Sequence, residues 1–148
     1  MDREQVANIW KEAWSDGLWY TPWGKAVEDL SPEQAAWQPM PGRHSIWQLV
    51  NHIVFWQDYT LRSARGQKPD RETFARELEV RNWEGPAEIT PAAWAEAKRR
   101  FQASYEQMIA LAGEAASLER PLYHLLHESY HVGQIMYLRA LQGLPPIE

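Results

Sequence analysis

Apolar residues recur at the spacing of an α-helix in four long stretches of the chain, and no stretch shows the sustained β-branched alternation that is typical of a strand. The four stretches cover residues 2–17, 44–64, 90–113 and 117–142. An amphipathic helix must bury its apolar face against another element. Four such helices predict an all-α fold, a four-helix bundle that forms one domain over residues 1–148.

Local capping signals add short helices between the first two long ones. Residues 2–5 and 31–34 each have the spacing of a capping box, and the second box predicts about one further helical turn. Thr21 followed by Pro22 predicts an N-cap and a first helical residue, opening a short helix that ends near Asp29.

Glycine and proline mark the connections between the helices. Residues 39–42, Pro-Met-Pro-Gly, form a clear break before the second long helix. Residues 66–89 are polar and contain two glycines and two prolines, so we expect an irregular long crossover connection. A connection of that length exceeds what a bundle turn needs, and it could cover a site or hold short strands or turns.

Charge and composition exclude several classes of partner. The chain carries 15 basic and 20 acidic residues, and its one dense basic patch is residues 98–100. Nucleic-acid binders concentrate Lys and Arg on one face, so we expect no nucleic-acid partner. No apolar run approaches the roughly 20 residues that cross a bilayer, and no apolar signal core follows Met1, so we expect no membrane contact and a cytoplasmic location.

Two residue types constrain the chemistry. The chain has no cysteine, so any metal ion must be held by nitrogen or oxygen ligands, and a thiol nucleophile would have to come from a small cosubstrate. It has nine tryptophans, several times the ordinary usage. Such large rings fill a core or line a pocket.

The five histidines lie in two short windows, residues 44–52 and 124–131. At about 100° per residue, His127 and His131 lie one turn apart on one helix face, so both rings can reach one ion. His52, on a neighbouring helix, is the natural third ligand. The helix that carries the pair is apolar nearly all round, which indicates burial. Buried imidazole nitrogens need partners, and a metal ion would supply one.

The spacing of the histidines leaves other interpretations open. A helical pair four residues apart also occurs by chance, and His44 and His124 are expected to be structural or surface residues. Glu128 points about 100° away from His127 and is not an obvious ligand. Gln134, one turn beyond the second histidine of the pair, could orient that ring or make an ordinary polar contact.

Two motifs carry a resemblance to a known family. Residues 127–135, His-Glu-Ser-Tyr-His-Val-Gly-Gln-Ile, contain two histidines four apart followed closely by Gly-Gln. Residues 41–53, Pro-Gly-Arg-His-Ser-Ile-Trp-Gln-Leu-Val-Asn-His-Ile, precede them in the chain and include His52. Together they resemble the paired signatures of the DinB/YfiT-like superfamily, and the order of the expected helices matches over nearly the whole chain.

The resemblance implies a four-helix bundle in which His52, His127 and His131 hold one divalent metal ion, with zinc or nickel foremost. All-nitrogen ligation leaves iron and manganese open as well. The resemblance also implies a homodimer. Some members of this superfamily are transferases or isomerases that use bacillithiol, mycothiol or glutathione, so no single reaction is implied. The translesion DNA polymerase that shares the name is unrelated.

Three functions are compatible with these features. The leading hypothesis is a metal-dependent enzyme acting on a small molecule, as a thiol-dependent transferase or a hydrolase, because three histidines leave a coordination position open. Its aromatic lining is expected from residues such as Trp47, Trp56 and Tyr59. The alternatives are a non-catalytic metal-binding or stress-response protein with a structural metal ion, and a dimeric binding module with an aromatic pocket.

Overall fold

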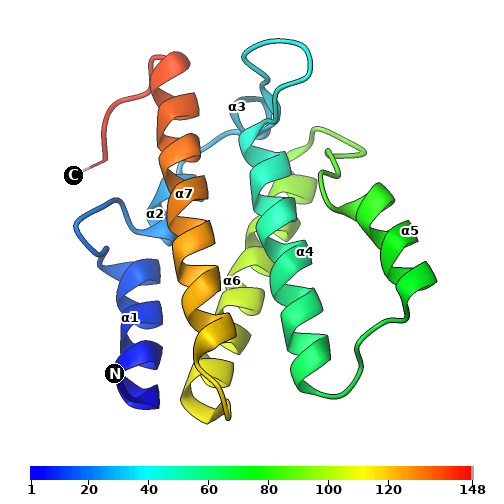
Figure 1. Ribbon diagram of the computed structural model, residues 1–148. Helices are drawn as coiled ribbons and strands as arrows, with labels where there is room; N and C mark the ends of the chain where they lie inside the picture. Colours follow the sequence, from blue (N-terminus) through cyan, green and yellow to red (C-terminus); the bar gives the residue numbers. More distant parts are fainter. Residues whose placement is uncertain (148) are drawn as a thin grey trace.

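The computed structural model describes residues 1–147, and within that range it contains helices and no strands (Figure 1). The all-α prediction is therefore confirmed. The helices are α1 (Arg3–Ser15), α2 (Trp23–Glu28), α3 (Pro32–Ala36), α4 (Ile46–Ala64), α5 (Arg71–Arg81), α6 (Pro91–Glu114) and α7 (Glu119–Leu141).

The long helices α1, α4, α6 and α7 form the bundle. In Figure 1, α7 runs between α1 and α4, and α6 crosses behind them. Helix α6 packs against both α1 and α4, while α7 packs beside α4. In Figure 1, the short helix α2 lies beside α7, above the end of α1, and α3 lies near the start of α4. Helix α5 lies on the outer side of α4. In the part of the chain that the structure describes, no helix is long and apolar enough to cross a membrane.

Capping residues set most of the helix starts. Both capping boxes expected from the sequence are present, at α1 and α3, and a third lies at Ser45, where α4 begins. In each box a side chain accepts from a backbone N–H that the helix leaves without a partner. At α2 the expectation was wrong, because this helix begins at Trp23 with Pro22 as its N-cap and no side-chain cap bond. The Thr21 hydroxyl instead donates to the backbone oxygen of Ile147.

The connection 66–89 is not irregular throughout, because it contains the helix α5. The helix has no buried residue and therefore shows no apolar stripe, which is why hydrophobic periodicity missed it. The start signal was present in the sequence, since the Asp70 side chain accepts from the backbone N–H of Thr73. An ion pair between Glu77 and Arg62, with a shortest contact of 2.7 Å, holds α5 against α4.

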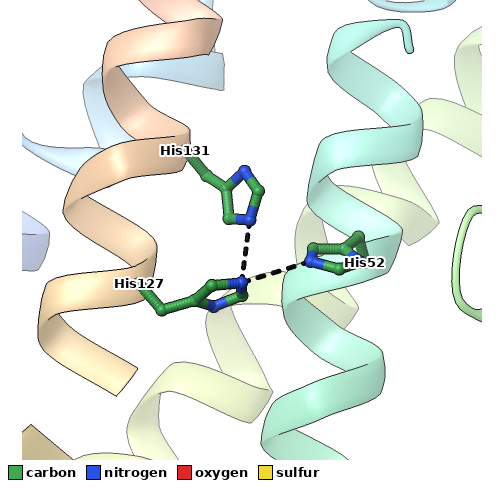
Figure 2. A group of neighbouring side chains, drawn as sticks. All are labelled: His52, His127 and His131. Atoms are coloured by element: carbon green, nitrogen blue, oxygen red, sulfur yellow. Dashed lines mark hydrogen bonds between the residues drawn. The ribbon is translucent and has the colours of Figure 1, made fainter. Parts of the chain in front are cut away.

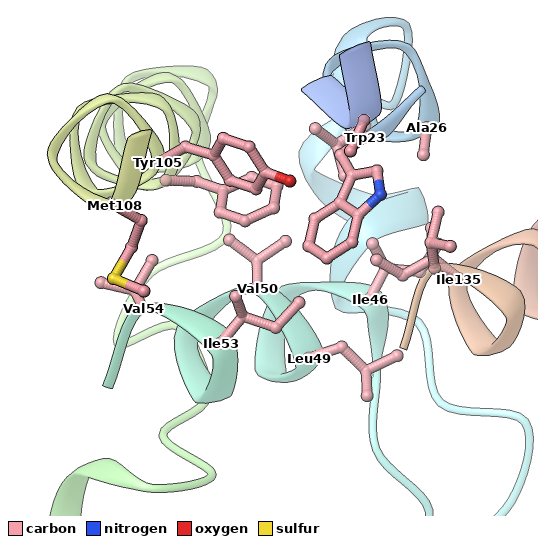
Figure 3. Packing of buried hydrophobic residues seen from close by; sticks show 14 of the residues in the cluster. Trp23, Ala26, Ile46, Leu49, Val50, Ile53, Val54, Tyr105, Met108 and Ile135 are labelled. Carbon is pink, nitrogen blue, oxygen red and sulfur yellow. The ribbon is translucent and has the colours of Figure 1, made fainter. Parts of the chain in front are cut away.

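One hydrophobic core joins the helices (Figure 3). Ile46, Val50 and Ile53 lie at helical spacing on α4 and are almost completely buried. Where α1 and α2 meet α6, the rings of Trp10 and Trp23 pack at centroid distances of 4.8 and 5.2 Å from the Tyr105 ring. Core filling, the simplest role expected for tryptophan, thus applies to these rings.

Candidate metal centre

Three imidazole rings from two helices meet between α4 and α7. His52 lies on α4, His127 and His131 lie on α7, and their rings converge (Figure 2). The centroid of the His52 ring lies 5.2 Å from that of His127 and 4.8 Å from that of His131. One ligand nitrogen from each residue belongs to a group in which all members lie within 4.8 Å of one another. The structure thus brings together all three residues selected from the sequence.

The spacing of the nitrogens is compatible with a shared metal ion. Nε2 of His127 lies 3.3 Å from Nε2 of His52 and 2.9 Å from Nε2 of His131. Two nitrogens bound about 2.0–2.1 Å from one ion, at angles of about 90–110°, are separated by about 2.8–3.4 Å. His52 and His131 are buried, whereas His127 is half-buried and lies on the side nearer to solvent. These residues could therefore hold one ion.

The tautomer of His52 follows from its contact with Asn82, the residue after α5. The side-chain oxygen of Asn82 accepts from the indole Nε1 of Trp56 over 3.0 Å, and an indole nitrogen can only donate. The same oxygen lies 2.8 Å from Nδ1 of His52, and the backbone oxygen of Asn82 lies 3.2 Å from it. Since both partners are acceptors, Nδ1 carries the proton. Nε2 consequently presents a lone pair to the cluster, as a ligand atom must.

The tautomer of His131 is set in the same way by Gln134. The side-chain oxygen of Gln134 lies 2.7 Å from Nδ1 of His131, and its amide nitrogen donates to the Tyr130 hydroxyl over 3.2 Å. An amide oxygen only accepts, so Nδ1 of His131 donates and its Nε2 faces the cluster unprotonated. Of the two roles considered for Gln134 from the sequence, orientation of a ring is the one that this contact supports.

Trp83 holds the plane of the His52 ring. Its indole stacks on His52 at a centroid distance of 3.7 Å and on His44 at 3.8 Å, with interplanar angles of 6° and 5°. His44 therefore has a structural contact, as expected. Sequence reasoning missed both Trp83 and Asn82, because they follow a helix without an apolar stripe and no motif marks them.

His124 stays outside the cluster and belongs to a buried polar chain. Its Nε2 lies 2.8 Å from the hydroxyl of Thr60, and its Nδ1 lies 3.1 Å from a carboxyl oxygen of Glu128. That oxygen also accepts from the amide of Gln57 over 2.9 Å. Burial raises the pKa of Glu128, while its bonds to His124 and Gln57 oppose that rise. The sequence indicated that Glu128 points away from the cluster, but not that it is completely buried.

Burial also keeps the clustered imidazoles neutral. It is the main cause that lowers the pKa of His52 to about 4, and the neighbouring His131 contributes to this shift. The pKa of His127 is likewise lowered to about 4 by burial and then by its histidine neighbours. Burial lowers the pKa of His131 as well. Because a ligating imidazole must be neutral, proton competition with a metal ion begins at a lower pH than for an exposed histidine.

We expect the metal-free protein to lose stability as the pH falls from about 6.5 toward 4. The unfolded chain protonates His52 and His127 near the ordinary pKa of 6.5, whereas the folded chain does so only near 4. Between these values the unfolded state binds more protons, so the free energy of unfolding decreases with acidification. Urea unfolding of the metal-free protein at pH 7 and pH 5 measures the effect. A double variant, His52→Asn/His127→Gln, should show a smaller difference, and an unchanged difference would contradict the assignment.

Replacement of Asn82 by alanine is expected to weaken zinc affinity by about 10–100-fold, the usual effect of losing a group that orients a ligand. The nearer of the two acceptors that keep the proton on Nδ1 of His52 would be lost, and only the backbone oxygen at 3.2 Å would remain. Asn51→Ala is the matched control, because the Asn51 amide also ties α4 to the segment after α5, through the oxygen of Glu84, and makes no side-chain hydrogen bond to a histidine of residues 1–147. Competition titration with a zinc chelator compares the variants, and equal affinities would exclude this role.

A pocket of about 260 Å³ opens beside His127. Trp56 lies on its wall together with Arg120, Tyr123 and His124. Of the three aromatic residues expected to line the site, only Trp56 does so. Trp47 is buried in the core against Trp94 at a centroid distance of 4.9 Å. Tyr59 packs against Phe74 of α5 at 4.6 Å.

Fold and site together define a helical-bundle protein with three imidazoles that could hold a metal ion. The family model described as the DinB superfamily matches residues 23–142, which include all three histidines and most of the bundle. The chain therefore belongs to the DinB superfamily, as its motifs suggested. Searches among curated proteins and among solved structures gave no match.

Proposed function

We propose that the protein is a metal-dependent enzyme that acts on a small molecule, as a thiol-dependent transferase or a hydrolase, with one divalent ion held by His52, His127 and His131. The observation that carries the proposal is the convergence of three ring nitrogens from two helices. Two of these rings are already in the tautomer that a metal ion requires.

Three protein ligands leave at least one coordination position for another molecule, as in catalytic rather than structural zinc sites. A divalent ion bound there would supply Lewis acidity and would bind water or a thiol as the anion. Residues of the chain would orient the ligand rings. The side-chain oxygens of Asn82 and Gln134 accept hydrogen bonds from Nδ1 of His52 and His131, respectively. Trp83 stacks on the face of the His52 ring. Since the chain lacks cysteine, a thiol nucleophile would be a cosubstrate of low molecular weight.

We propose zinc or nickel as the ion. Iron and manganese are the other candidates, because all-nitrogen ligation does not choose among these ions. Elemental analysis of protein purified without a histidine tag tests the metal content. A cobalt-loaded sample then tests access, because a thiol that reaches the ion produces a thiolate-to-cobalt absorption band. A chain that retains no metal after such purification and binds none on titration would overturn the proposal.

A structural metal ion is the second candidate, because the cluster joins α4 to α7 and an ion there would cross-link the two helices. Chelation distinguishes the two functions. A catalytic ion should leave with little change in melting temperature beyond the mass-action effect of its binding. Removal of a structural ion should reduce the free energy of unfolding by several kcal/mol and change the circular dichroism of the bundle.

We also propose a cytoplasmic location for the protein, which a cellular fractionation experiment tests.

A homodimer is also part of the proposal, and an exposed stripe on α7 supports it. Tyr123, Tyr130 and Tyr137 recur every seven residues, and Leu126 and Leu141 lie beside them, all exposed. A seven-residue apolar repeat suits packing against an identical helix. A pocket of about 850 Å³ borders this stripe and has Trp37, Tyr130 and Tyr137 on its wall. It is the feature that favours the third candidate, a dimeric aromatic-pocket module, whose ligand affinity should survive replacement of all three histidines.

Replacement of the stripe residues Leu126 and Tyr137 by glutamate is expected to convert a dimer to a monomer. Buried carboxylates without partners would oppose association. The control variant, Val80→Glu/Ile89→Glu, adds the same charges at exposed apolar positions outside α7 and should leave the dimer intact. Light scattering after size exclusion measures the mass, and a monomeric wild-type chain at high concentration would exclude the dimer.

A further inference from the structure

A third pocket, of about 610 Å³, lies where the end of α4, the end of α6 and the start of α7 meet. These helix ends gather at the lower end of the bundle in Figure 1. The pocket contains residues from 59–68 of α4 and its C-terminal turn, from 107–117 at the end of α6, and Arg120 and Pro121 of α7. The proposed metal ligands do not line it.

Three cationic side chains surround this pocket. Arg65, Lys68 and Arg120 line it, and in the described part of the chain Glu114 is the single carboxylate on its wall. The surplus of positive charge contrasts with the formal net charge of −5 of the chain. Among residues 1–147, no carboxylate lies within 4.0 Å of the charged nitrogens of these three residues. Cations that gather around a concave surface without carboxylate partners favour an anionic ligand.

The remaining wall is suited to a small organic molecule. Leu61 and Leu111 supply apolar surface, and hydroxyls of Thr60 and Ser117 lie among the lining residues. The Arg65 guanidinium donates to the side-chain oxygen of Gln107 over 2.8 Å, which orients the cation at the pocket. An apolar floor with a few placed polar groups is the usual composition of a small-molecule site.

This cationic pocket adjoins the smaller pocket beside the candidate metal centre. Arg120 lines both the cationic pocket and the smaller pocket beside His127. Thr60, on the wall of the first, lies 2.8 Å from Nε2 of His124, which lies on the wall of the second. Along α4, Thr60 follows His52 by about two helical turns, or about 11–12 Å, at 1.5 Å per residue.

We propose that the cationic pocket binds the carboxylate or phosphate group of the small molecule whose other end reacts at the metal centre. The substrate class is therefore an organic anion long enough to span about two helical turns. The anion site itself rests on the pocket and its three cations, whereas the placement of the reactive end rests on the proposed function above.

Calorimetric titration tests the two parts separately. Octanoate and inorganic phosphate are titrated into metal-free protein, which tests the anion site alone and distinguishes the two anionic groups. Mercaptooctanoate and mercaptopropanoate are titrated into zinc-loaded protein, because only the longer thiol can reach from the metal centre to the cations. Each titration is repeated with Arg65→Gln/Arg120→Gln and with Lys11→Gln/Arg100→Gln, a control that removes two exposed cations outside the pocket.

The Arg65→Gln/Arg120→Gln variant should bind octanoate or phosphate, and also mercaptooctanoate, about tenfold or more weakly than wild type, because charge-assisted bonds are lost. Zinc content should not change, and the control should match wild type. Mercaptopropanoate affinity should fall by less than mercaptooctanoate affinity, because Arg120 also lines the pocket beside His127 but Arg65 lines only the cationic pocket. Equal losses in both double variants, or no anion binding by the wild-type chain, would overturn the anion site. The wild-type chain could instead bind no zinc and still bind the anion through Arg65 and Arg120. That result would refute the proposed function and leave the anion site assigned. Circular dichroism checks that each variant is folded. Lys68→Gln, at an exposed position on the pocket wall, is an independent variant that should also bind the anion more weakly than wild type.

Discussion

Replacement of His127 or His131 by alanine is expected to reduce bound zinc from about one ion per chain to background. Each imidazole points its Nε2 atom into the cluster, and the two atoms lie 2.9 Å apart. Loss of either leaves two nitrogens, too few to hold the ion against water and buffer. His52→Ala should behave in the same way, because its Nε2 lies 3.3 Å from that of His127. Elemental analysis of the folded, gel-filtered variants measures the effect.

The control for this experiment is His124→Ala, on the same helix one turn before His127. His124 bonds to Thr60 and Glu128 and not to the cluster, so this variant should keep its zinc while losing stability. Full zinc content in the His127 or His131 variant would refute the ligand assignment. Zinc loss in His124→Ala protein that remains folded would show that the buried polar chain helps to hold the ion.

Replacement of Trp10 by alanine is expected to reduce the free energy of unfolding by about 3–5 kcal/mol, which is typical of deleting a large buried ring. The Trp10 side chain is completely buried and packs on Tyr105, where α1 meets α6. Its indole nitrogen has no hydrogen-bond partner within residues 1–147, so the cost comes from lost packing. Urea unfolding followed by circular dichroism measures the change.

Trp19→Ala is the matched control, since it deletes the same side chain from a fully exposed position. Trp19 has a positive φ of 69°, a backbone conformation that is unfavourable for any residue with a Cβ atom. Alanine meets a similar conformational cost at this position, so the cost does not contribute to the difference between wild type and Trp19→Ala. We expect a change within about 0.5 kcal/mol. If Trp10→Ala costs no more than Trp19→Ala, the contact between α1 and α6 does not contribute to the core as the structure implies.

The four long helices and the three clustered histidines could be predicted because their signals are local. The apolar stripes and capping residues of α1, α4, α6 and α7 depend on spacing within one helix. The same is true of His127, His131 and Gln134, which share a face of α7 because of the helical period. The pairing of this face with His52 needed the resemblance of the two motifs in addition to their spacing.

The sequence by itself determined the all-α class, the long helices and the set of imidazoles that could meet. Only the tertiary structure decided which nitrogens of His52 and His131 face the cluster. Their tautomers are set by two hydrogen-bond acceptors, the side-chain oxygens of Asn82 after α5 and of Gln134 on α7. It also decided the burial of Glu128 and the meeting of Arg65 with Arg120 at one pocket. Contacts of this kind depend on how helices pack and on the path of a polar connection, and neither follows from the periodicity of a single helix.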